Sequence, residues 1–82
     1  MIVKIKLFGP AAQIVGSPEI LIQLMAPGTD CHAVMRAIRQ QYPQLAPLMP
    51  SARLAVNCAY CQDDSPVTSH DELALIQAVS GG

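Results

Sequence analysis

The stretch that decides the fold is Ile2-Val-Lys-Ile-Lys-Leu-Phe8. Successive side chains of a β-strand point to opposite sides of a sheet, so a strand with one buried face alternates in hydrophobicity. Here one face is wholly apolar and the other carries the charges: the first consists of Val3, Ile5 and Leu7, the second of Ile2, Lys4, Lys6 and Phe8. The pattern predicts a strand over residues 2–8 with one face on a core.

Further strands are predicted by short apolar runs between turn residues. They cover residues 19–25, 54–57 and 73–79, with a brief return strand or turn at 58–61 and a short strand near Val67. Gly9-Pro10 ends the first strand. The first two strands are therefore expected to form an antiparallel hairpin with a loop of about eight residues.

One helix is predicted between the second and third strands. Asp30 is expected to be its N-cap, and the helix runs to about Gln41. Its apolar residues follow the i, i+3/i+4, i+7 spacing of a helix with one buried stripe, formed by Cys31, Val34, Met35, Ile38 and Tyr42. Pro43 ends the helix. Residues 44–52, which include Pro47 and Pro50, are expected to form a loop or one short helical turn.

The predicted order is β-β-α-β-β-β. It indicates an α+β fold in which one main helix crosses one face of a mixed sheet of four to five strands. If the first and last strands lie parallel at the centre, the fold is a β-grasp, the arrangement of ubiquitin; the pairing order does not follow from the pattern alone. The 82 residues predict a single domain, residues 1–82.

The composition excludes several classes of protein. With 51% hydrophobic and 13% charged residues the chain is not intrinsically disordered. The net charge of −1 gives no reason to expect a nucleic acid or an anionic membrane as partner. No apolar run approaches the ~20 residues of a membrane span. The first residues are not expected to be a signal peptide, because Lys4 and Lys6 interrupt the apolar stretch that one needs. A cytoplasmic location with three reduced cysteines is expected.

The end of the sequence, Gly81-Gly82, is the strongest functional signal. A glycine pair packs no side chain and loses much entropy on ordering, so it adds no stability to a fold. It does provide a thin strand with an accessible carboxylate, which can enter an active site where a Cβ would clash. Residues 79–82 are expected to form a flexible tail, with the Gly82 carboxylate as the reacting group; an end without function is the alternative.

Three stretches resemble the small, sulfur-carrier subunits of molybdopterin synthase. They are Lys6-Leu-Phe-Gly9 followed by Gly16, Leu54-Ala-Val-Asn57, and Asp71-Glu-Leu-Ala-Leu-Ile76 followed by Val79-Ser-Gly-Gly82. The similarity spans essentially the whole chain, and the last stretch is the most specific. The chain departs from the family pattern at Ala12-Gln13, where Arg-Glu is common, at Gln77-Ala78, where Pro-Pro is usual, and at His70, which replaces a turn glycine that can adopt positive φ.

The resemblance implies a ubiquitin-like β-grasp fold and chemistry at Gly82. An E1-like adenylating enzyme would use ATP and magnesium to form an acyl-adenylate, and a sulfur donor would displace AMP to leave a thiocarboxylate. Its sulfur would be largely ionised and nucleophilic, as a thiolate is. The large synthase subunit would take up the tail, Val79 to Gly82, in a heterotetramer, and sulfur would pass to a cyclic pterin precursor. The chain itself would bind no cofactor and act as a co-substrate.

A docking surface is expected on the Lys face of the first strand. Phe8 is apolar at a position where the alternation predicts exposure, and Ile76 lies opposite the inward residues of the last strand. If these strands are neighbours, Phe8 and Ile76 sit together outside the core, and Tyr60 could join them. Matching positions in the resembled family contact both the activating enzyme and the large subunit. Scattered surface apolar residues are the alternative.

Other readings stay open from the residues alone. Cys58 and Cys61 form a single CxxC, which would need Cys31, His32 or His70 to complete a zinc site; small half-buried thiols are the simpler interpretation. Ser69-His70-Asp71 contains triad residue types without the convergence that a triad needs. The chain could also carry sulfur for the thiamine thiazole ring, be conjugated to lysines as a protein modifier, or bind partners without chemistry.

Overall fold

The computed structural model describes residues 1–25, 29–62 and 64–77. Five strands, two α-helices and one 3-10 helix follow one another along the chain. Their bounds are β1 (Ile2–Leu7), α1 (Gly9–Val15), β2 (Glu19–Gln23), α2 (Cys31–Gln41), η1 (Pro43–Ser51), β3 (Ala52–Val56), β4 (Ala59–Tyr60) and β5 (Leu73–Gln77).

The five strands form one mixed sheet in the order β2-β1-β5-β3-β4. β1 and β5, the first and last strands, pair in parallel, and every other pair is antiparallel. The sheet order confirms the predicted β-grasp arrangement, with β5 between β1 and β3. The parallel register places Lys6 opposite Ala74 and Leu7 opposite Leu75, so the apolar faces of the two strands coincide.

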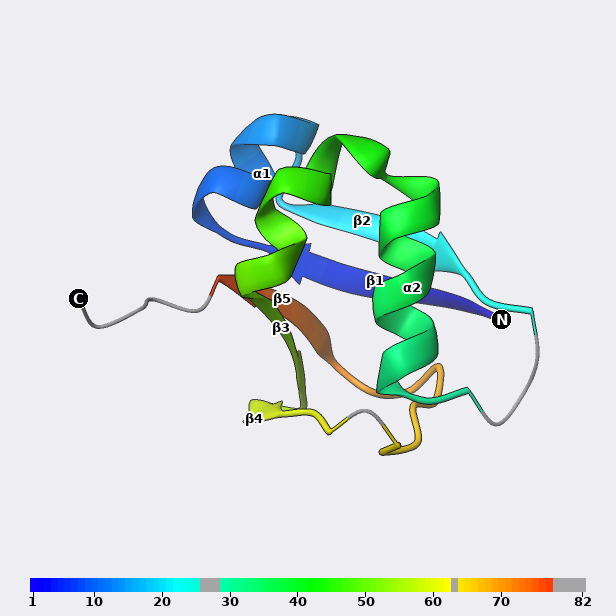
Figure 1. Cartoon of the computed structure of the whole chain (residues 1–82). Coiled ribbons are helices and arrows are strands. Elements are labelled where there is room, and N and C mark those ends of the chain that lie inside the picture. Colours follow the sequence, from blue (N-terminus) through cyan, green and yellow to red (C-terminus); the bar gives the residue numbers. More distant parts are fainter. Residues whose placement is uncertain (26–28, 63, 78–82) are drawn as a thin grey trace.

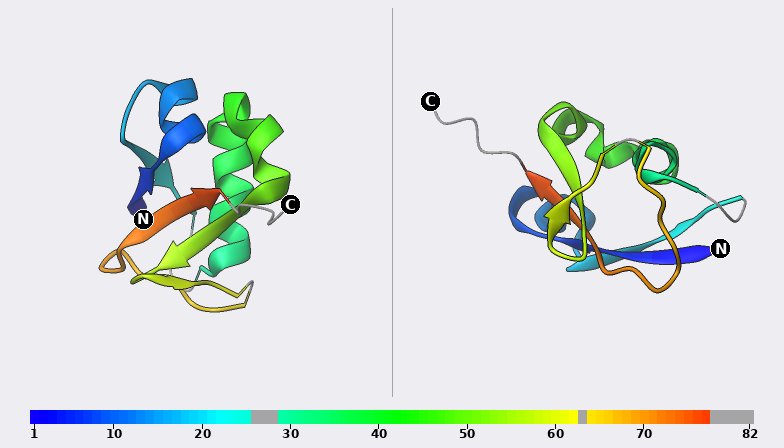
Figure 2. Two further views of the ribbon diagram at one scale, coloured as in Figure 1. Left: turned by 90° about the vertical axis from the view of Figure 1, so that its left-hand side faces the viewer. Right: turned by 90° about the horizontal axis from the view of Figure 1, so that it is seen from below.

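The molecule has two layers, with α1, α2 and η1 all on one face of the sheet (Figures 1 and 2). The core lies between the layers, because the inward residues of each strand are buried while their neighbours point away. Among its fully buried side chains are Ile5, Ile22, Ile38, Leu45, Leu73 and Leu75. The opposite face of the sheet carries no helix among the described residues.

Helix α2 forms as predicted. The Asp30 side chain accepts a hydrogen bond from the Ala33 N–H at 2.9 Å, and so satisfies a donor that a helix start leaves unpaired. Cys31, Val34 and Ile38 are buried against the sheet. None of the described helices is both long and apolar enough to span a bilayer.

Helix α1 corrects the predicted eight-residue loop between β1 and β2. Gly9-Pro10 does end β1, but proline is also favourable in the first turn of a helix, where its missing N–H costs nothing. Gly16 then ends the helix in the left-handed conformation, at φ 80°, and its N–H donates to the Ala12 carbonyl. Seven residues are too few for a stable isolated helix, and Ala11 anchors this one in the core.

Several element boundaries also differ from the predictions. Residues 43–51 form a 3-10 helix longer than one turn, because Leu45 and Met49 bury their side chains despite the prolines. β2 ends at Gln23, β3 spans 52–56, and near Val67 there is only an isolated bridge between Asp30 and Pro66. The β5 ladder is described to Gln77, so the predicted continuation to residue 79 lies outside the described residues.

Side chains cap the outer edge of the sheet at β2. The Gln41 amide accepts from the Gln23 N–H at 3.0 Å and donates to the Gln23 carbonyl at 2.7 Å. The Ser17 hydroxyl bonds to the N–H and carbonyl of Glu19 in the same way. Because unpaired edge groups invite pairing with another strand, these caps protect β2 from edge-to-edge association.

Candidate docking surface

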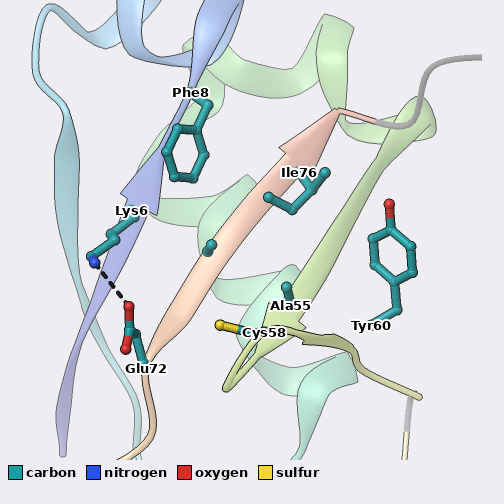
Figure 3. Close-up of a pocket in the computed structure, with 8 residues that line it drawn as sticks. Lys6, Phe8, Ala55, Cys58, Tyr60, Glu72 and Ile76 are labelled. Atoms are coloured by element: carbon teal, nitrogen blue, oxygen red, sulfur yellow. Dashed lines mark hydrogen bonds and ion pairs between the residues drawn. The ribbon is translucent and has the colours of Figure 1, made fainter.

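The open face of the sheet holds a pocket of about 370 Å³. It lies over β1, β5 and β3, the three neighbouring strands at the middle of the sheet (Figure 3). Its lining residues come from the start and the end of the chain and from the β3–β4 hairpin: Lys6, Phe8, Ala55, Cys58, Tyr60, Glu72, Ala74 and Ile76.

Small side chains form the floor of the pocket and larger ones form its walls. Ala55 and Ala74 are register partners on β3 and β5, and Ala74 also pairs with Lys6 on β1. Adjacent alanines at the centre of a sheet leave a hollow, because the longer side chains around them stand higher. The pocket is thus a consequence of strand register.

Three apolar or aromatic side chains form the walls. Phe8 directly follows β1 in an extended conformation, and Ile76 projects from β5 (Figure 3). Tyr60 lies on β4, and the Arg53 guanidinium sits 4.4 Å from its ring centroid, a distance typical of a cation–π contact. Phe8 is 54% exposed and Tyr60 55% exposed. Their apolar surface is available to a partner, and Arg53 holds one of the rings.

An ion pair closes one end of the pocket. Lys6 Nζ donates a hydrogen bond to Glu72 Oε1 at 2.8 Å (Figure 3). This hydrogen bond and the attraction of the two charges raise the pKa of the Lys6 ammonium and lower the pKa of the Glu72 carboxyl. Both groups are exposed to solvent, so the pair contributes little to stability. Its main effect is to place two opposite charges at the rim of the pocket.

Asn57 joins the β3–β4 hairpin to the start of β5. It lies in the two-residue turn at φ 52°, a left-handed conformation that asparagine tolerates. Its side chain donates to Asp71 Oδ1 at 3.0 Å and accepts from the Glu72 N–H at 2.9 Å. A hydrogen bond from the Thr68 N–H and the one from Asn57 lower the pKa of Asp71. This network fixes where Glu72 meets the pocket.

The cysteines correct two expectations. Cys31 and Cys61 form a disulfide with their Cα atoms 6.2 Å apart, so the expectation of three reduced thiols is wrong for this pair. Cys58 is free and exposed on the pocket, whereas a half-buried thiol was expected. Cys58 is at φ 70°, whereas His70, where the sequence suggested positive φ, is not among the positive-φ residues of the described chain.

The structure brings together the three side chains proposed for docking. Phe8, Tyr60 and Ile76 line one pocket; the pairing of β1 with β5 brings Phe8 and Ile76 together, and β4 adds Tyr60. The other site residues expected from the sequence, Val79, Ser80, Gly81 and Gly82, lie outside the described residues. Sequence reasoning missed Lys6 and Glu72, although the alternation that placed Phe8 outward also placed Lys6 there.

No alternative site emerges in the part of the chain that the structure describes. Within residues 1–25, 29–62 and 64–77, no group of three His, Cys, Asp or Glu side chains is placed to hold a metal ion. Cys61 pairs with Cys31, which separates it from Cys58. Asp71 accepts hydrogen bonds from Asn57 and Thr68 and so acts as a turn residue.

The fold is that of ubiquitin-like β-grasp proteins. The small archaeal modifier protein SAMP1 of Haloferax volcanii superposes with a TM-score of 0.81 at 21% identity, with both chains fully covered. A chain from the complex of subunits 1 and 2 of the molybdopterin-converting factor of Helicobacter pylori superposes with a TM-score of 0.68 at 24% identity, again with full coverage of both. At these identities the likeness shows the fold alone.

The sequence assigns the family within that fold. Residues 5–82 match the ThiS family, and the chain belongs to it. It is 33% identical over 81 residues to the molybdopterin synthase sulfur carrier subunit of Dictyostelium discoideum, covering 96% of this chain and 94% of that protein. It is 34% identical over 82 residues to the subunit of the same name in Caenorhabditis briggsae, covering 98% and 96%.

Proposed function

We propose that this chain is the sulfur carrier subunit of a molybdopterin synthase. The observation that carries the proposal is the similarity over nearly the full length to relatives of that name, at 33% and 34% identity. The family match runs through residue 82 and so includes the glycine pair. A similarity that covered only the β-grasp core would support the fold without the chemistry.

The reaction takes place at the Gly82 carboxylate, which is a poor electrophile until it is activated. An E1-like adenylating enzyme joins it to AMP from ATP with the help of magnesium, and pyrophosphate leaves. A sulfur donor then attacks the acyl carbon and AMP leaves, so one oxygen of the carboxylate is replaced by sulfur. The resulting thiocarboxylate is the nucleophile that delivers sulfur to a cyclic pterin precursor in the large subunit.

The pocket of the open face is the docking surface in this proposal. It exposes two aromatic rings and a branched aliphatic side chain beside one ion pair, the mixture that anchors protein interfaces. Ile76 on β5 lines the pocket and lies only a few residues before Gly82 in the sequence. A partner that binds the pocket therefore contacts the chain close to its reacting end. The Helicobacter pylori structure contains subunits 1 and 2 in one complex, which supports the large subunit as a partner.

The segment between α2 and β3 favours this pathway over thiamine thiazole synthesis. Sulfur carriers for the thiazole ring usually have less chain between the main helix and the third strand. In this protein residues 43–51 form η1, and Leu45 and Met49 are buried in the core. The insertion is thus part of the folded domain.

The first experiment is the intact mass of the full chain after incubation with ATP, magnesium, a sulfide source and the cognate activating enzyme. The proposal expects a mass gain equal to the exchange of one oxygen for one sulfur. The matched control lacks only Gly82; we expect it to fold normally and gain no mass. Thiocarboxylate formation on the truncated control would contradict the proposal.

A second stage identifies the pathway. Adding the large subunit and a cyclic pterin precursor to the thiocarboxylated protein should return the carrier to its original mass and place sulfur on the pterin. Loss of sulfur only to a thiazole precursor, or branched adducts through Gly82 to lysines of other proteins, would assign the chain to one of the alternative classes.

A further inference from the structure

The Cys31–Cys61 disulfide connects the core helix to the hairpin that forms one wall of the pocket. Cys31 is the first residue of α2 and is only 2% exposed. Cys61 directly follows β4 and is half-buried. The bond spans 30 residues of sequence, and the Cα separation of 6.2 Å lies within the range that disulfides adopt.

The hairpin that this disulfide holds is short. β4 contains two residues, Ala59 and Tyr60, and it is the edge strand at the end of the sheet opposite β2. Beyond it, the Cys61 N–H donates to the Leu54 carbonyl at 2.8 Å, which extends the pairing with β3. A two-residue edge strand has few contacts of its own, and segments of this kind open locally more easily than core strands.

The same hairpin carries two residues of the pocket. Tyr60 and Cys58 line it (Figure 3), and the Arg53 guanidinium of β3 lies over the Tyr60 ring. The position of this wall therefore depends on the pairing of β4 with β3. That pairing is held from one side by the Asn57 network and from the other by the disulfide.

The disulfide is accessible to a thiol reagent from one side only. Cys31 is buried, whereas Cys61 is half-buried at the surface. An attacking thiolate would therefore reach the Cys61 sulfur and displace Cys31. Displacement leaves the Cys31 sulfur in the first turn of α2, where the helix dipole favours negative charge. Exchange of this kind proceeds through a mixed disulfide.

We propose that Cys31 and Cys61 form a reversible redox latch: the disulfide keeps β4, one wall of the pocket, well ordered, and its reduction makes this wall less ordered. A dithiol reductant supplies the electrons: one thiolate bonds to the Cys61 sulfur, and Cys31 leaves and is protonated. The second thiol then attacks the mixed disulfide and releases Cys61. The dithiol ends as a disulfide, and the protein gains two electrons and two protons. With the latch closed, β4 is held against β3; with it open, β4 frays and the pocket loses a preformed wall.

The test compares the full chain after mild oxidation and after treatment with dithiothreitol. Iodoacetamide should modify one cysteine of the oxidised protein, Cys58, and all three after reduction and denaturation. In the native protein, amide exchange of Cys61, whose N–H is bonded to the Leu54 carbonyl, should speed up on reduction, while that of the central strand residue Leu75 should change far less.

Two variants make the test specific. Cys61→Ser should show fast exchange in the hairpin under both conditions, whereas Cys58→Ser should keep the full redox response. Three modified cysteines in the oxidised protein would overturn the proposal, as would identical hairpin exchange before and after reduction. Loss of the redox response in Cys58→Ser would also overturn it, because it would assign the bond to Cys58.

The consequence for docking rests on the proposed function and is measured separately. Reduction should weaken binding to the large subunit by ~3-fold or more, because ordering a frayed wall costs binding free energy. Equal affinity of the two forms would overturn the docking part of the proposal. If neither form binds the large subunit, the proposed function fails, while amide exchange still decides whether the latch exists.

Discussion

The two faces of the sheet differ in what covers them, although the same strands supply similar side chains to both. On β5, Leu75 points into the core and is 2% exposed, while the next residue, Ile76, points into the pocket on the open face. Both are large aliphatic side chains, so composition does not distinguish them. One is covered by the helical layer of its own chain, and the other is available to a different molecule.

The helical layer covers one face of the sheet, and the other face keeps a docking surface. Phe8, Tyr60 and Ile76 gather around one hollow, and the Lys6–Glu72 ion pair lies at its rim. Side-chain caps on Gln23 and Glu19 close the β2 edge, and at the opposite edge β4 is only two residues long. The capped edge and the short edge strand limit edge-to-edge pairing, and the pocket gathers apolar side chains of the open face in one place.

The largest expected effect distinguishes the two faces at adjacent positions of β5. Leu75→Ala should lower the free energy of unfolding by ~2–5 kcal/mol, because it removes buried methyl groups and leaves a cavity. Ile76→Ala should cost about 1 kcal/mol or less, since its side chain is only partly buried. Urea denaturation with unchanged m-values measures both. Equal losses would mean that the open face contributes to folding as the covered face does.

A smaller effect is expected in binding. Phe8→Ala should weaken docking to the large subunit by about 10- to 30-fold, because it removes an exposed aromatic anchor from the pocket. Leu21→Ala is the matched control: Leu21 is 57% exposed on the same face of the sheet but belongs to β2, outside the pocket. Titration calorimetry compares the two. A loss of the same size in Leu21→Ala would place the interface elsewhere on the open face.

The smallest effect concerns the carboxylate that ties the hairpin to β5. The pKa of Asp71 is lowered in the folded protein, so its contribution to stability is present above the pKa of the unfolded chain. It is lost as the pH falls through the lower, folded pKa. Asp71→Asn should therefore be less stable than the natural protein near neutral pH, and the difference should disappear in acid.

Urea denaturation between neutral pH and pH ~2 measures this difference. Asp64→Asn, which removes a carboxylate at an exposed position of the loop before β5, is the matched control. A difference between Asp71→Asn and the natural protein that persists in acid would assign the effect to geometry instead of charge.

The elements with a complete local signal were predictable. The alternation in residues 2–8 identified β1 and its buried face, and Asp30 with the apolar spacing after it identified α2. Helix α1 was missed because Gly9-Pro10 ends a strand and starts a helix with the same residues. The short helix is stable only where Ala11 meets the core, and no local pattern shows that contact.

The candidate site was predictable only in part for a related reason. Phe8 and Ile76 could be paired once β1 and β5 were taken as neighbours, because each is an apolar residue on an otherwise outward face. The floor could not be found, since alanines such as Ala55 and Ala74 carry no sign of function. The Cys31–Cys61 pair was missed because 30 residues separate the two thiols, and the packing of α2, η1 and the β3–β4 hairpin decides whether they meet.

By itself, the sequence determined the inward face of β1, where α2 begins, and that the chain carries the glycine pair of its family. These are local properties: they follow from side-chain period, from one cap and from a short motif. Only the tertiary structure decided that β1 and β5 pair in parallel in the register Lys6–Ala74, and hence that a pocket opens between Phe8, Tyr60 and Ile76. Alternative registers of whole strands compete with one another, and the packing of both layers decides which register is the most stable.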